Sequence, residues 1–516
     1  MSEAQLPTAS NGADSEVSRK PHSSKPPPAR TPLPVFQAFL TLIIQFSEPI
    51  TATVIYPFII KAVRSTGITE GDEKKTGYYA GVIESVFFLT ECLSFFQWGR
   101  ASDKYGRRPV LLFGPLGLAI AMFGFGLSRS FWALMVFRGF QGVFNGNIGV
   151  ARTVMTELTD PTNRVDLFTL TPIVWSLGLT LGPAIGGLLA YPADTWPNAF
   201  RGWPLFVQHP WFLPCAVTGI FSFGIFVVSF LGLKETSKRD RKSQRRSPSQ
   251  ESDGTLNENE NTPLIQDDVE RETYHSIATP TSSETPPESR RNGSFISLLS
   301  DPILRRTLLS HAFLAFTDMS YQVLIPLVYS TSISVGGLGL SPYQLGVIMA
   351  TMGFGGGALN ILVFKPILKR IGPRKTYMIS YSALILDFGL FWVLRELAGG
   401  WFGRVNWVVW VLIGVQMVVS TFGYAMWNAM GLCIIGSAPP GALGATNGLA
   451  QTVSSGMRCL GPVFASSLYS ISLETKLVGE RGHLVELVMI MITLVGVCAS
   501  TMLDKKLDGF ETAVDE

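Results

Sequence analysis

The chain has 516 residues, of which only 15% are charged, and its mean hydropathy is +0.29. Soluble domains carry roughly 25% charged residues, so this composition excludes an ordinary soluble enzyme. The net charge of +3 is small, and no nucleic-acid partner is expected. No paired spacing links the five cysteines, which lie in apolar runs and predict neither disulfides nor a metal site: Cys92, Cys215, Cys433, Cys459 and Cys498.

Hydrophobic runs long enough to cross a membrane recur along the chain, which predicts an all-α polytopic membrane protein. A polar tail at 1–33 comes first, and residues 234–300, rich in Ser, Thr, Pro and Glu, predict a disordered linker. Two six-helix halves are expected at 34–233 and 301–503, followed by a tail at 504–516. The twelve predicted spans are 35–60, 77–98, 110–128, 131–156, 165–190, 206–232, 304–330, 343–367, 376–395, 405–435, 442–470 and 484–503.

Basic residues predict the orientation of these spans. Lys and Arg gather in the N-terminal tail, in the second and eighth connections and in the C-terminal tail, which lie on one side if every span crosses once. Because basic loops stay in the cytoplasm, both termini and the linker are predicted to be cytoplasmic.

The second connection, WGRASDKYGRRP at 98–109, is too charged and too rich in glycine to lie in a membrane core. Its spacing of Gly99, Asp103, Gly106, Arg107 and Arg108 resembles the signature of the major facilitator superfamily. That resemblance implies a fold of twelve transmembrane helices in two halves, and a role for this loop as a cytoplasmic latch between them. The alternative is that the arginines only fix the topology.

The fourth span contains an arginine well inside an apolar helix, in the pattern Leu134-x₃-Arg138-Gly139-x-x-Gly142. Such a charge costs about 2.5–3.5 kcal/mol on insertion scales, so Arg138 should face a cavity or a carboxylate. The pattern is similar to a second motif of the family, which implies a role for Arg138 in proton coupling. Alternatively, the arginine is structural and binds backbone carbonyls.

Small residues and one proline mark the fifth span, as Gly178-x₃-Gly182-Pro183-x-x-Gly186-Gly187. Glycines four apart share a helix face and permit close helix contact, and Pro183 permits a kink. This pattern resembles the motif of the drug:proton antiporter branch of the family, which implies antiport. Ordinary packing of small residues is the alternative.

Five carboxylates fall within apolar spans: Glu48, Glu84, Glu91, Asp318 and Asp387. An acid inside a membrane predicts a functional site, so Glu48, Asp318 and Glu84 are the candidate proton carriers, with Glu48 first. Glu91 could instead set the neighbouring loop, and Asp387 could partner a nearby polar group.

Other polar and aromatic side chains in the spans could line a substrate path. Within a wider set that includes Asn147, Gln416 and Arg458, the favoured substrate-binding candidates are Gln45, Asn145, Gln322, Trp427 and Asn428. His311 is expected to be structural and not a proton relay. Most aromatic residues of a helical bundle are packing or interfacial residues.

The stretches GVIESVFFLTE, WGRASDKYGRRPVLL and SLGLTLGPAIGGLLA resemble the zinc-induced-facilitator-like group of this branch. Two features of that group are missing. There is no paired-cysteine motif near the start, and Lys234-Glu235-Thr236 keeps the Glu-Thr of an element after the sixth span but loses its histidine. A metal-linked substrate is therefore not expected, and no cofactor beyond the proton gradient is predicted.

The linker contains Glu260, Leu264 and Ile265 in the acidic dileucine pattern. This pattern resembles signals that adaptor complexes read for delivery to the vacuole or lysosome, although six-residue patterns also arise by chance. It favours a vacuolar or endolysosomal membrane over the plasma membrane.

Taken together, the sequence predicts a proton-coupled antiporter that exports small organic molecules such as drugs, toxins or metabolites from the cytosol. A nutrient symporter or facilitator for a sugar, amino acid or peptide is the alternative, and a non-transporting receptor on the same scaffold is a third. No catalytic constellation is present, so an enzyme is not expected. Substrate identity and oligomeric state stay open.

Overall fold

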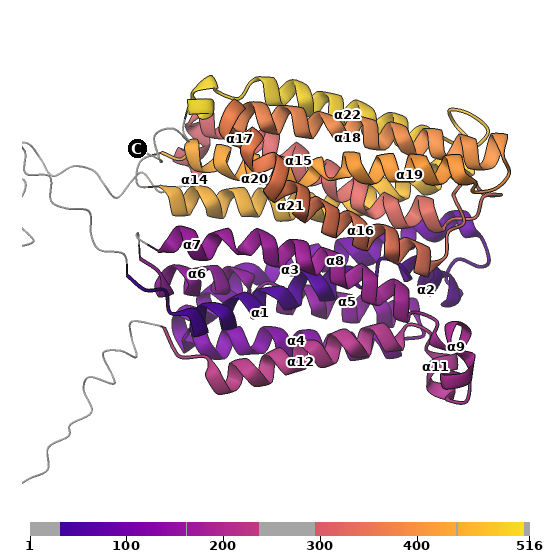
Figure 1. Ribbon diagram of the computed structural model, residues 1–516, viewed down its shortest axis with the longest axis horizontal. Coiled ribbons are helices and arrows are strands. Elements are labelled where there is room, and N and C mark those ends of the chain that lie inside the picture. The colour runs from indigo at the N-terminus through magenta and orange to yellow at the C-terminus, as the bar shows by residue number, and fades with distance from the viewer. Residues whose placement is uncertain (1–30, 161–162, 237–294, 440–441, 510–516) are drawn as a thin grey trace, which may run out of the picture.

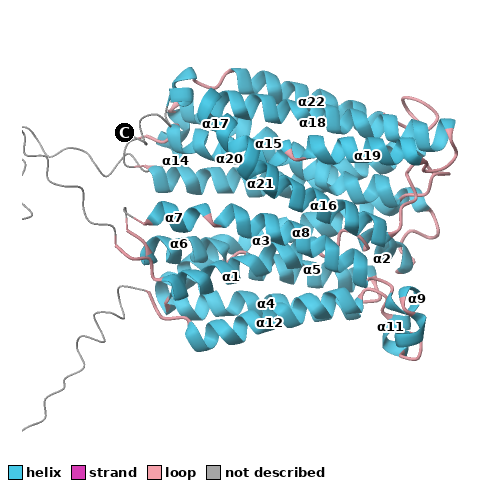
Figure 2. Cartoon of the chain, viewed as in Figure 1, coloured by secondary structure: helices cyan, strands magenta, loops and turns pink. Residues whose placement is uncertain are grey.

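The computed structural model describes residues 31–160, 163–236, 295–439 and 442–509. These residues form a bundle of helices with no strand among them (Figure 2). The predicted all-α fold is thereby confirmed. The sorting pattern of Glu260, Leu264 and Ile265 lies outside the described residues.

The first half, coloured indigo to magenta in Figure 1, contains six spans, three of which are broken helices. Its spans in chain order are α1 (Val35–Thr53) with α2 (Ile59–Ser65), α3 (Thr76–Tyr105), α4 (Arg107–Leu127), α5 (Phe131–Asn145) with α6 (Ile148–Leu158), α7 (Arg164–Thr169) with α8 (Thr171–Leu189), and α12 (Phe212–Gly232). Shorter helices join them: η1 (Glu73–Lys75), α9 (Pro192–Thr195), α10 (Pro197–Phe200) and α11 (Pro204–Gln208).

The second half, orange to yellow, repeats this arrangement and includes two π-helical turns (Figure 1). Its elements are α14 (Phe295–Ser300), α15 (Pro302–Ser330), α16 (Pro342–Leu359) with η2 (Asn360–Phe364) and α17 (Lys365–Ile371), α18 (Pro373–Arg395) with η3 (Glu396–Trp401), α19 (Trp407–Ser420) with α20 (Phe422–Gly436), α21 (Leu443–Thr475), α22 (Leu484–Thr501) and η4 (Lys505–Gly509). Among the described residues of this half, helical structure begins at Phe295.

Ten of the described helices or helical runs are long and apolar enough to cross a membrane. The other two predicted spans are the broken pair α5 and α6, and α21, which is long but rich in serine, threonine and glycine. The predicted first span, 35–60, is also interrupted, because the chain turns between Thr53 and Ile59.

Local sequence explains where several helices begin. Ser130 accepts a hydrogen bond from the backbone of Ala133, and Ser341 forms a reciprocal capping box with Gln344. Gly106 and Gly372 occupy matching places in the two halves, where the second span ends and the third begins. Both have positive φ, 99° and 83°, a conformation that favours glycine.

Both described ends of the chain lie at one end of the bundle, called here the terminal end (Figure 1). The opposite end, with α2 and α9, is called the far end. Near the far end the halves touch closely: a Cβ on Gly81 of α3 would lie 2.8 Å from the Cβ of Ser466 in α21. One on Gly187 of α8 would lie 2.6 Å from the Cα of Gly346 in α16.

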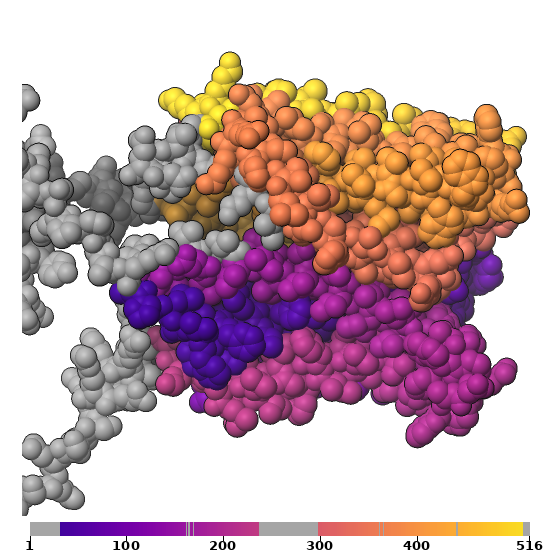
Figure 3. All heavy atoms as spheres, viewed as in Figure 1, coloured from indigo at the N-terminus to yellow at the C-terminus, as the bar shows by residue number. Residues whose placement is uncertain are grey.

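Toward the terminal end this close contact between the halves is lost. Gly444 and Gly448, in the first turns of α21, have no atom within 4 Å of where a Cβ would stand. Contacts seal the far end, by contrast, because Glu73 accepts hydrogen bonds of 2.7 Å from the backbone and hydroxyl of Ser332 in the other half. The halves therefore part toward the terminal end. Figure 3 shows them as two stacked bodies.

Candidate functional site

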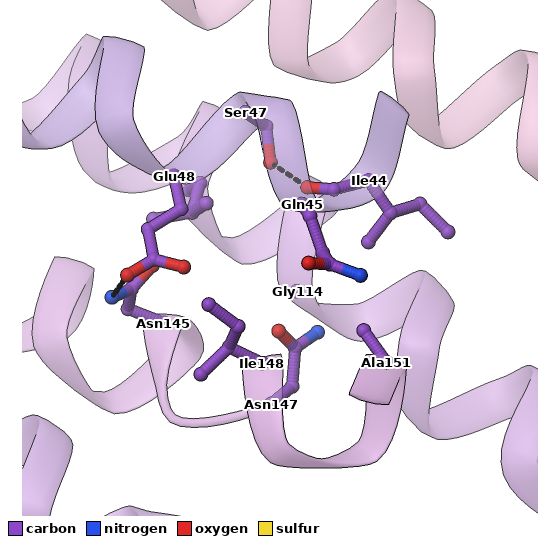
Figure 4. Close-up of a pocket in the computed structure, with 10 residues that line it drawn as sticks. Ile44, Gln45, Ser47, Glu48, Gly114, Asn145, Asn147, Ile148 and Ala151 are labelled. Atoms are coloured by element: carbon purple, nitrogen blue, oxygen red, sulfur yellow. Dashed lines mark hydrogen bonds between the residues drawn. The ribbon is translucent and has the colours of Figure 1, made fainter. Parts of the chain in front are cut away.

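Glu48 lies in the middle of the first half, where α1 passes the break between α5 and α6. Its Oε1 accepts a hydrogen bond of 2.8 Å from Asn145, the last residue of α5 (Figure 4). The two side chains line a small cavity of about 10 Å³ together with Gln45, Asn147 and Gly114. Glu48 is 6% exposed, so its carboxyl group is screened from bulk water.

Three buried polar atoms around this cavity have no hydrogen-bond partner among the described residues: Gln45 Oε1, Glu48 Oε2 and Asn147 Nδ2. Buried polar groups are nearly always satisfied, and a space of this size holds about one water molecule. A water molecule in this cavity would therefore give Glu48 a polar partner besides Asn145. Gln45, a predicted substrate-binding residue, donates to Met155 Sδ of its own half at 2.8 Å.

Arg138 and Glu84 form a buried ion pair inside the first half, as predicted for an arginine deep in a span. Nη2 of Arg138 lies 2.9 Å and 3.1 Å from the two carboxylate oxygens of Glu84. Arg138 also donates to the backbone oxygen of Ala52 and to Gln141, and its guanidinium stacks on Phe87 at 4.3 Å. Arg138 thus has both a carboxylate and a backbone carbonyl as partners, and its role in proton coupling stays a prediction.

Asp318 of α15 is the corresponding acid of the second half. It accepts hydrogen bonds from Gln322 Nε2 at 2.8 Å and from Trp427 Nε1 at 3.0 Å. The guanidinium of Arg458 lies over the Trp427 ring, 4.8 Å from its centroid, and His311 meets the same ring edge to face with the centroids 5.6 Å apart. Three residues singled out by sequence, Asp318, Gln322 and Trp427, are thus brought together.

Charged side chains of the two halves interact electrostatically between the Glu48 and Asp318 clusters. Arg458 of α21 acts electrostatically on Glu48 and Glu91 of the first half and on Asp318 of its own half. Arg152 of α6 acts on the same two glutamates and is itself acted on by Arg458. Glu91, for which a loop-setting role was an alternative, is 5% exposed and belongs to this group.

Sequence reasoning missed Arg152, although a signal was available. It lies fourteen residues after Arg138 within the same predicted span, and any cation at that depth indicates a functional site. A second missed group lies at the far end, where buried Arg395 pairs with Glu486 and His483 binds Glu396 at 2.6 Å.

The 98–109 segment, which was predicted as a loop, is helical on both sides of Gly106, because α3 continues to Tyr105 and α4 begins at Arg107. Its side chains connect α3, α4 and α6. Arg107 binds Asp103 at 2.6 Å and Glu157 at 3.1 Å. Arg108 donates to the backbone oxygen of Phe230 in α12. These contacts all lie within the first half, so a latch between the halves stays a prediction. Gly99 has no neighbour within 4 Å of a Cβ position.

Glu235 explains why the Glu-Thr element follows the sixth span. Its carboxylate accepts hydrogen bonds of 2.8 Å and 2.9 Å from the backbone N–H groups of Arg107 and Arg108, which begin α4. An acid stabilises a helix N-terminus. A Cβ on Gly106 would lie 2.6 Å from the same carboxylate, so glycine is needed for this approach.

The glycine motif of α8 serves two different surfaces. Cβ atoms on Gly178, Gly182 and Gly186 would meet α1, at Pro49, Thr53 and the backbone oxygen of Val54. Gly187 meets α16 of the other half, and Pro183 contributes its carbonyl to the same contact. The motif thus permits both packing within a half and close approach between halves.

The remaining candidates lie within the second half. Asn428 donates to Asn360 at 3.0 Å. Asp387 is 1% exposed and accepts from Tyr321 at 3.4 Å, which agrees with its alternative role as partner of a polar group. No group of metal-ligating side chains exists among the described residues.

Similar proteins are transporters, as the sequence analysis expected, and not enzymes. The chain is 31% identical to Major facilitator-type transporter psiT2 of Psilocybe cyanescens, over 91% of this chain and 90% of the relative. It is 28% identical to Major facilitator superfamily multidrug transporter mfsB of Aspergillus fumigatus, over 86% and 79%. The predicted group is represented by Protein ZINC INDUCED FACILITATOR-LIKE 1 of Arabidopsis thaliana, at 25% identity over 86% of each chain.

Solved structures agree on the fold. The crystal structure of a D-xylose-proton symporter matches with a TM-score of 0.61 and 13% identity, over 91% of this chain and 97% of that one. The family model described as Major Facilitator Superfamily matches residues 41–462. Twelve spans in two halves, the loop motif and these matches agree, and the chain belongs to the Major Facilitator Superfamily.

Proposed function

We propose that this protein exports small organic molecules from the cytosol in exchange for protons, by alternating access between its two halves. The observation that supports this most is that buried acids from both halves lie near two solvent-accessible arginines, Arg152 and Arg458. Glu48 and Glu91 come from the first half and Asp318 from the second. These acids lie where the two halves begin to separate toward the terminal end.

Glu48 is the proposed proton carrier because its hydrogen bonds leave one oxygen unused. Asn145 holds Oε1, whereas Oε2 faces the small cavity without a partner among the described residues. Glu84, by contrast, is neutralised by Arg138 through both oxygens. A carboxyl group that can gain a proton without breaking an ion pair is better suited to repeated cycles.

Relatives support the direction of transport. One relative is named a multidrug transporter and another, from Aspergillus niger, is named an efflux pump. For this chain, export and antiport are proposals, and a nutrient symporter is the competing function. The symporter among the solved structures shares the fold only.

Transport in sealed vesicles with an imposed pH gradient tests the proposal. A panel of fluorescent organic cations, neutral compounds and anions should include one that moves against the proton flow and stops when the gradient collapses. Glu48→Gln should lose most of this gradient-driven movement, whereas Glu480→Gln, in an exposed far-end loop, should keep it. Movement with the protons would instead establish a symporter.

The terminal end is proposed to face the cytoplasm. Arg107 and Arg108 begin α4 there, and Lys369, Arg370 and Arg374 flank the matching connection of the second half. Basic residues are retained on the cytoplasmic side. Delivery to the vacuolar membrane through Glu260, Leu264 and Ile265 is proposed on the dileucine pattern alone. Replacing Leu264 and Ile265 by alanine should then redirect a tagged protein to the cell surface.

A further inference from the structure

Two arginines, one from each half, lie near enough to repel each other electrostatically, and neither has an ionic partner among the described residues. Arg152 is exposed on α6 and Arg458 is partly exposed on α21. Neither guanidinium makes an ion pair or hydrogen bond to another part of the chain that the structure describes, although each lies among acids. Arg138 and Arg395, the other arginines buried in the bundle, both have carboxylate partners.

An arginine inside a membrane bundle without a partner calls for a water-filled path or a ligand. Space is available here, because Gly448 and Gly456 of α21 have nothing within 4 Å of a Cβ position. The arginines are therefore placed to meet a molecule that enters between the halves. The acids beside them are buried behind hydrogen bonds, Glu48 with Asn145 and Asp318 with Trp427.

Arg458 is connected to Asp318 through Trp427. Asp318 accepts the indole N–H of Trp427 at 3.0 Å, and the face of that ring lies 4.8 Å from the Arg458 guanidinium. A cation over a ring face makes no N–H hydrogen bond to a polar acceptor there, so the N–H donors of the guanidinium stay available. Those donors suit the bidentate binding of a carboxylate, sulfonate or phosphate.

We infer that Arg152 and Arg458 form an anion clamp, one arginine from each half, that binds the anionic group of the transported molecule. Its substrates are organic molecules carrying a carboxylate, sulfonate or phosphate ester. Because the two arginines lie on different halves, a bound anion bridges them and offsets their mutual repulsion. Asp318 and Trp427 are positioning residues for this clamp. The inference rests on the proposed function in that it assumes transport of small organic molecules. It does not depend on exchange for protons.

The test measures equilibrium binding and uptake with three naphthalene probes of matched size. The probes are 2-naphthalenesulfonate, neutral 2-naphthalenemethanol and the cation 2-naphthylmethylammonium. Purified full-length protein should bind the sulfonate best. Arg458→Gln and Arg152→Gln should each weaken its binding by about tenfold or more, because each loses charge-assisted hydrogen bonds. Arg404→Gln, an exposed far-end arginine, is the control and should bind normally.

Further variants separate the clamp from general damage. Arg458→Lys keeps the charge but loses the planar fork, so it should bind the sulfonate more weakly than wild type and better than Arg458→Gln. Trp427→Phe should weaken sulfonate binding while leaving the unfolding temperature near that of wild type. Preference for the neutral or cationic probe, an unaffected Arg152→Gln/Arg458→Gln double variant, or no sulfonate binding at all would overturn the anion clamp.

The two proposals fail in different measurements. Sulfonate binding is measured without any gradient, so its loss in the arginine variants supports the clamp whatever the proton does. Uptake is then measured with a pH gradient of either direction. Sulfonate movement in the same direction as the protons would keep the clamp and overturn antiport.

Discussion

At the scale of single residues, the Arg138–Glu84 pair shows how charge is accommodated inside the bundle. Both side chains are almost fully buried, at 0% and 3% exposure, and the guanidinium is further satisfied by Ala52, Gln141 and Phe87. Removing one member of such a pair leaves an uncompensated buried charge, whereas removing both does not.

This difference gives a prediction for stability. Arg138→Met alone should lower the free energy of unfolding by about 3–5 kcal/mol, and adding Glu84→Gln should restore a large part of it. The measurement is the thermal unfolding midpoint of purified protein in detergent. If the double variant were as unstable as the single one, the contacts to Ala52 and Phe87 would matter more than the ion pair.

The double variant also separates structure from coupling. A purely structural arginine predicts that a restabilised Arg138→Met/Glu84→Gln protein transports normally. A coupling role predicts that it folds but no longer responds to a pH gradient.

At the scale of elements, the packing of α8 on α1 depends on the absence of side chains. A Cβ on Gly178 would lie 2.3 Å from Pro49 Cγ, and one on Gly186 would lie 1.9 Å from the backbone oxygen of Val54. Backbone atoms cannot rotate away, so even one methyl group must displace a helix. The antiporter-like motif therefore has a packing role whatever its part in transport.

Gly178→Ala should accordingly destabilise the protein by about 1–3 kcal/mol, the range for overpacked cores. Gly389→Ala on α18 is the matched control, because nothing lies within 4 Å of its Cβ position, and alanine favours a helix more than glycine does. Equal unfolding temperatures for the two variants would show that α1 and α8 separate more easily than this geometry indicates.

The sequence predicted the transmembrane spans but not the breaks within them. The twelve apolar runs and the basic connections could be predicted from spacing and composition. The breaks were not predicted, although Asn145-Gly146-Asn147 between α5 and α6 is a turn signal, because the apolar residues on both sides continue the pattern of one helix. Periodicity reports which face is apolar and carries no signal for a turn that tertiary contacts stabilise.

The site was predicted in part for a similar reason. Acids and arginines inside apolar runs stand out one by one, so Glu48, Arg138 and Asp318 were found. Their partners come from other helices, and spacing along one helix says nothing about which helix lies opposite. Thus Trp427 was selected without its hydrogen bond to Asp318, and Arg152 was overlooked.

At the scale of the whole molecule, the described conformation is closed at the far end and parted at the terminal end. Gly187 and Gly346 bring α8 and α16 together, and Glu73 with Ser332 adds polar contacts. Alternating access requires these contacts to break as others form. The far-end contacts are therefore part of the equilibrium between two states.

A wedge at this contact should shift that equilibrium. A Cβ on residue 346 would lie only 2.6 Å from the Cα of Gly187. The valine side chain of Gly346→Val would therefore push α8 and α16 apart and disfavour closure of the far end. Distances between spin labels on α2 and on the 331–341 loop should lengthen. Gly355→Val in the same helix, with open space around it, should leave the distances unchanged, and an unchanged distance in Gly346→Val would contradict the wedge.

The π-helical turn η2, between α16 and α17, affects the helical register of the eighth span. A π turn accommodates one residue more than an α turn, and each residue of an α-helix advances the side chains by about 100°. Deleting one residue from 361–364 would therefore convert η2 into a regular α turn while α17 keeps nearly the same orientation relative to α16. Deleting one residue from the regular part of α16 would instead rotate everything after it by about 100°. The turn that begins at Asn360, which accepts from Asn428, is thus the place where the eighth span can lose a residue without changing the direction of either end.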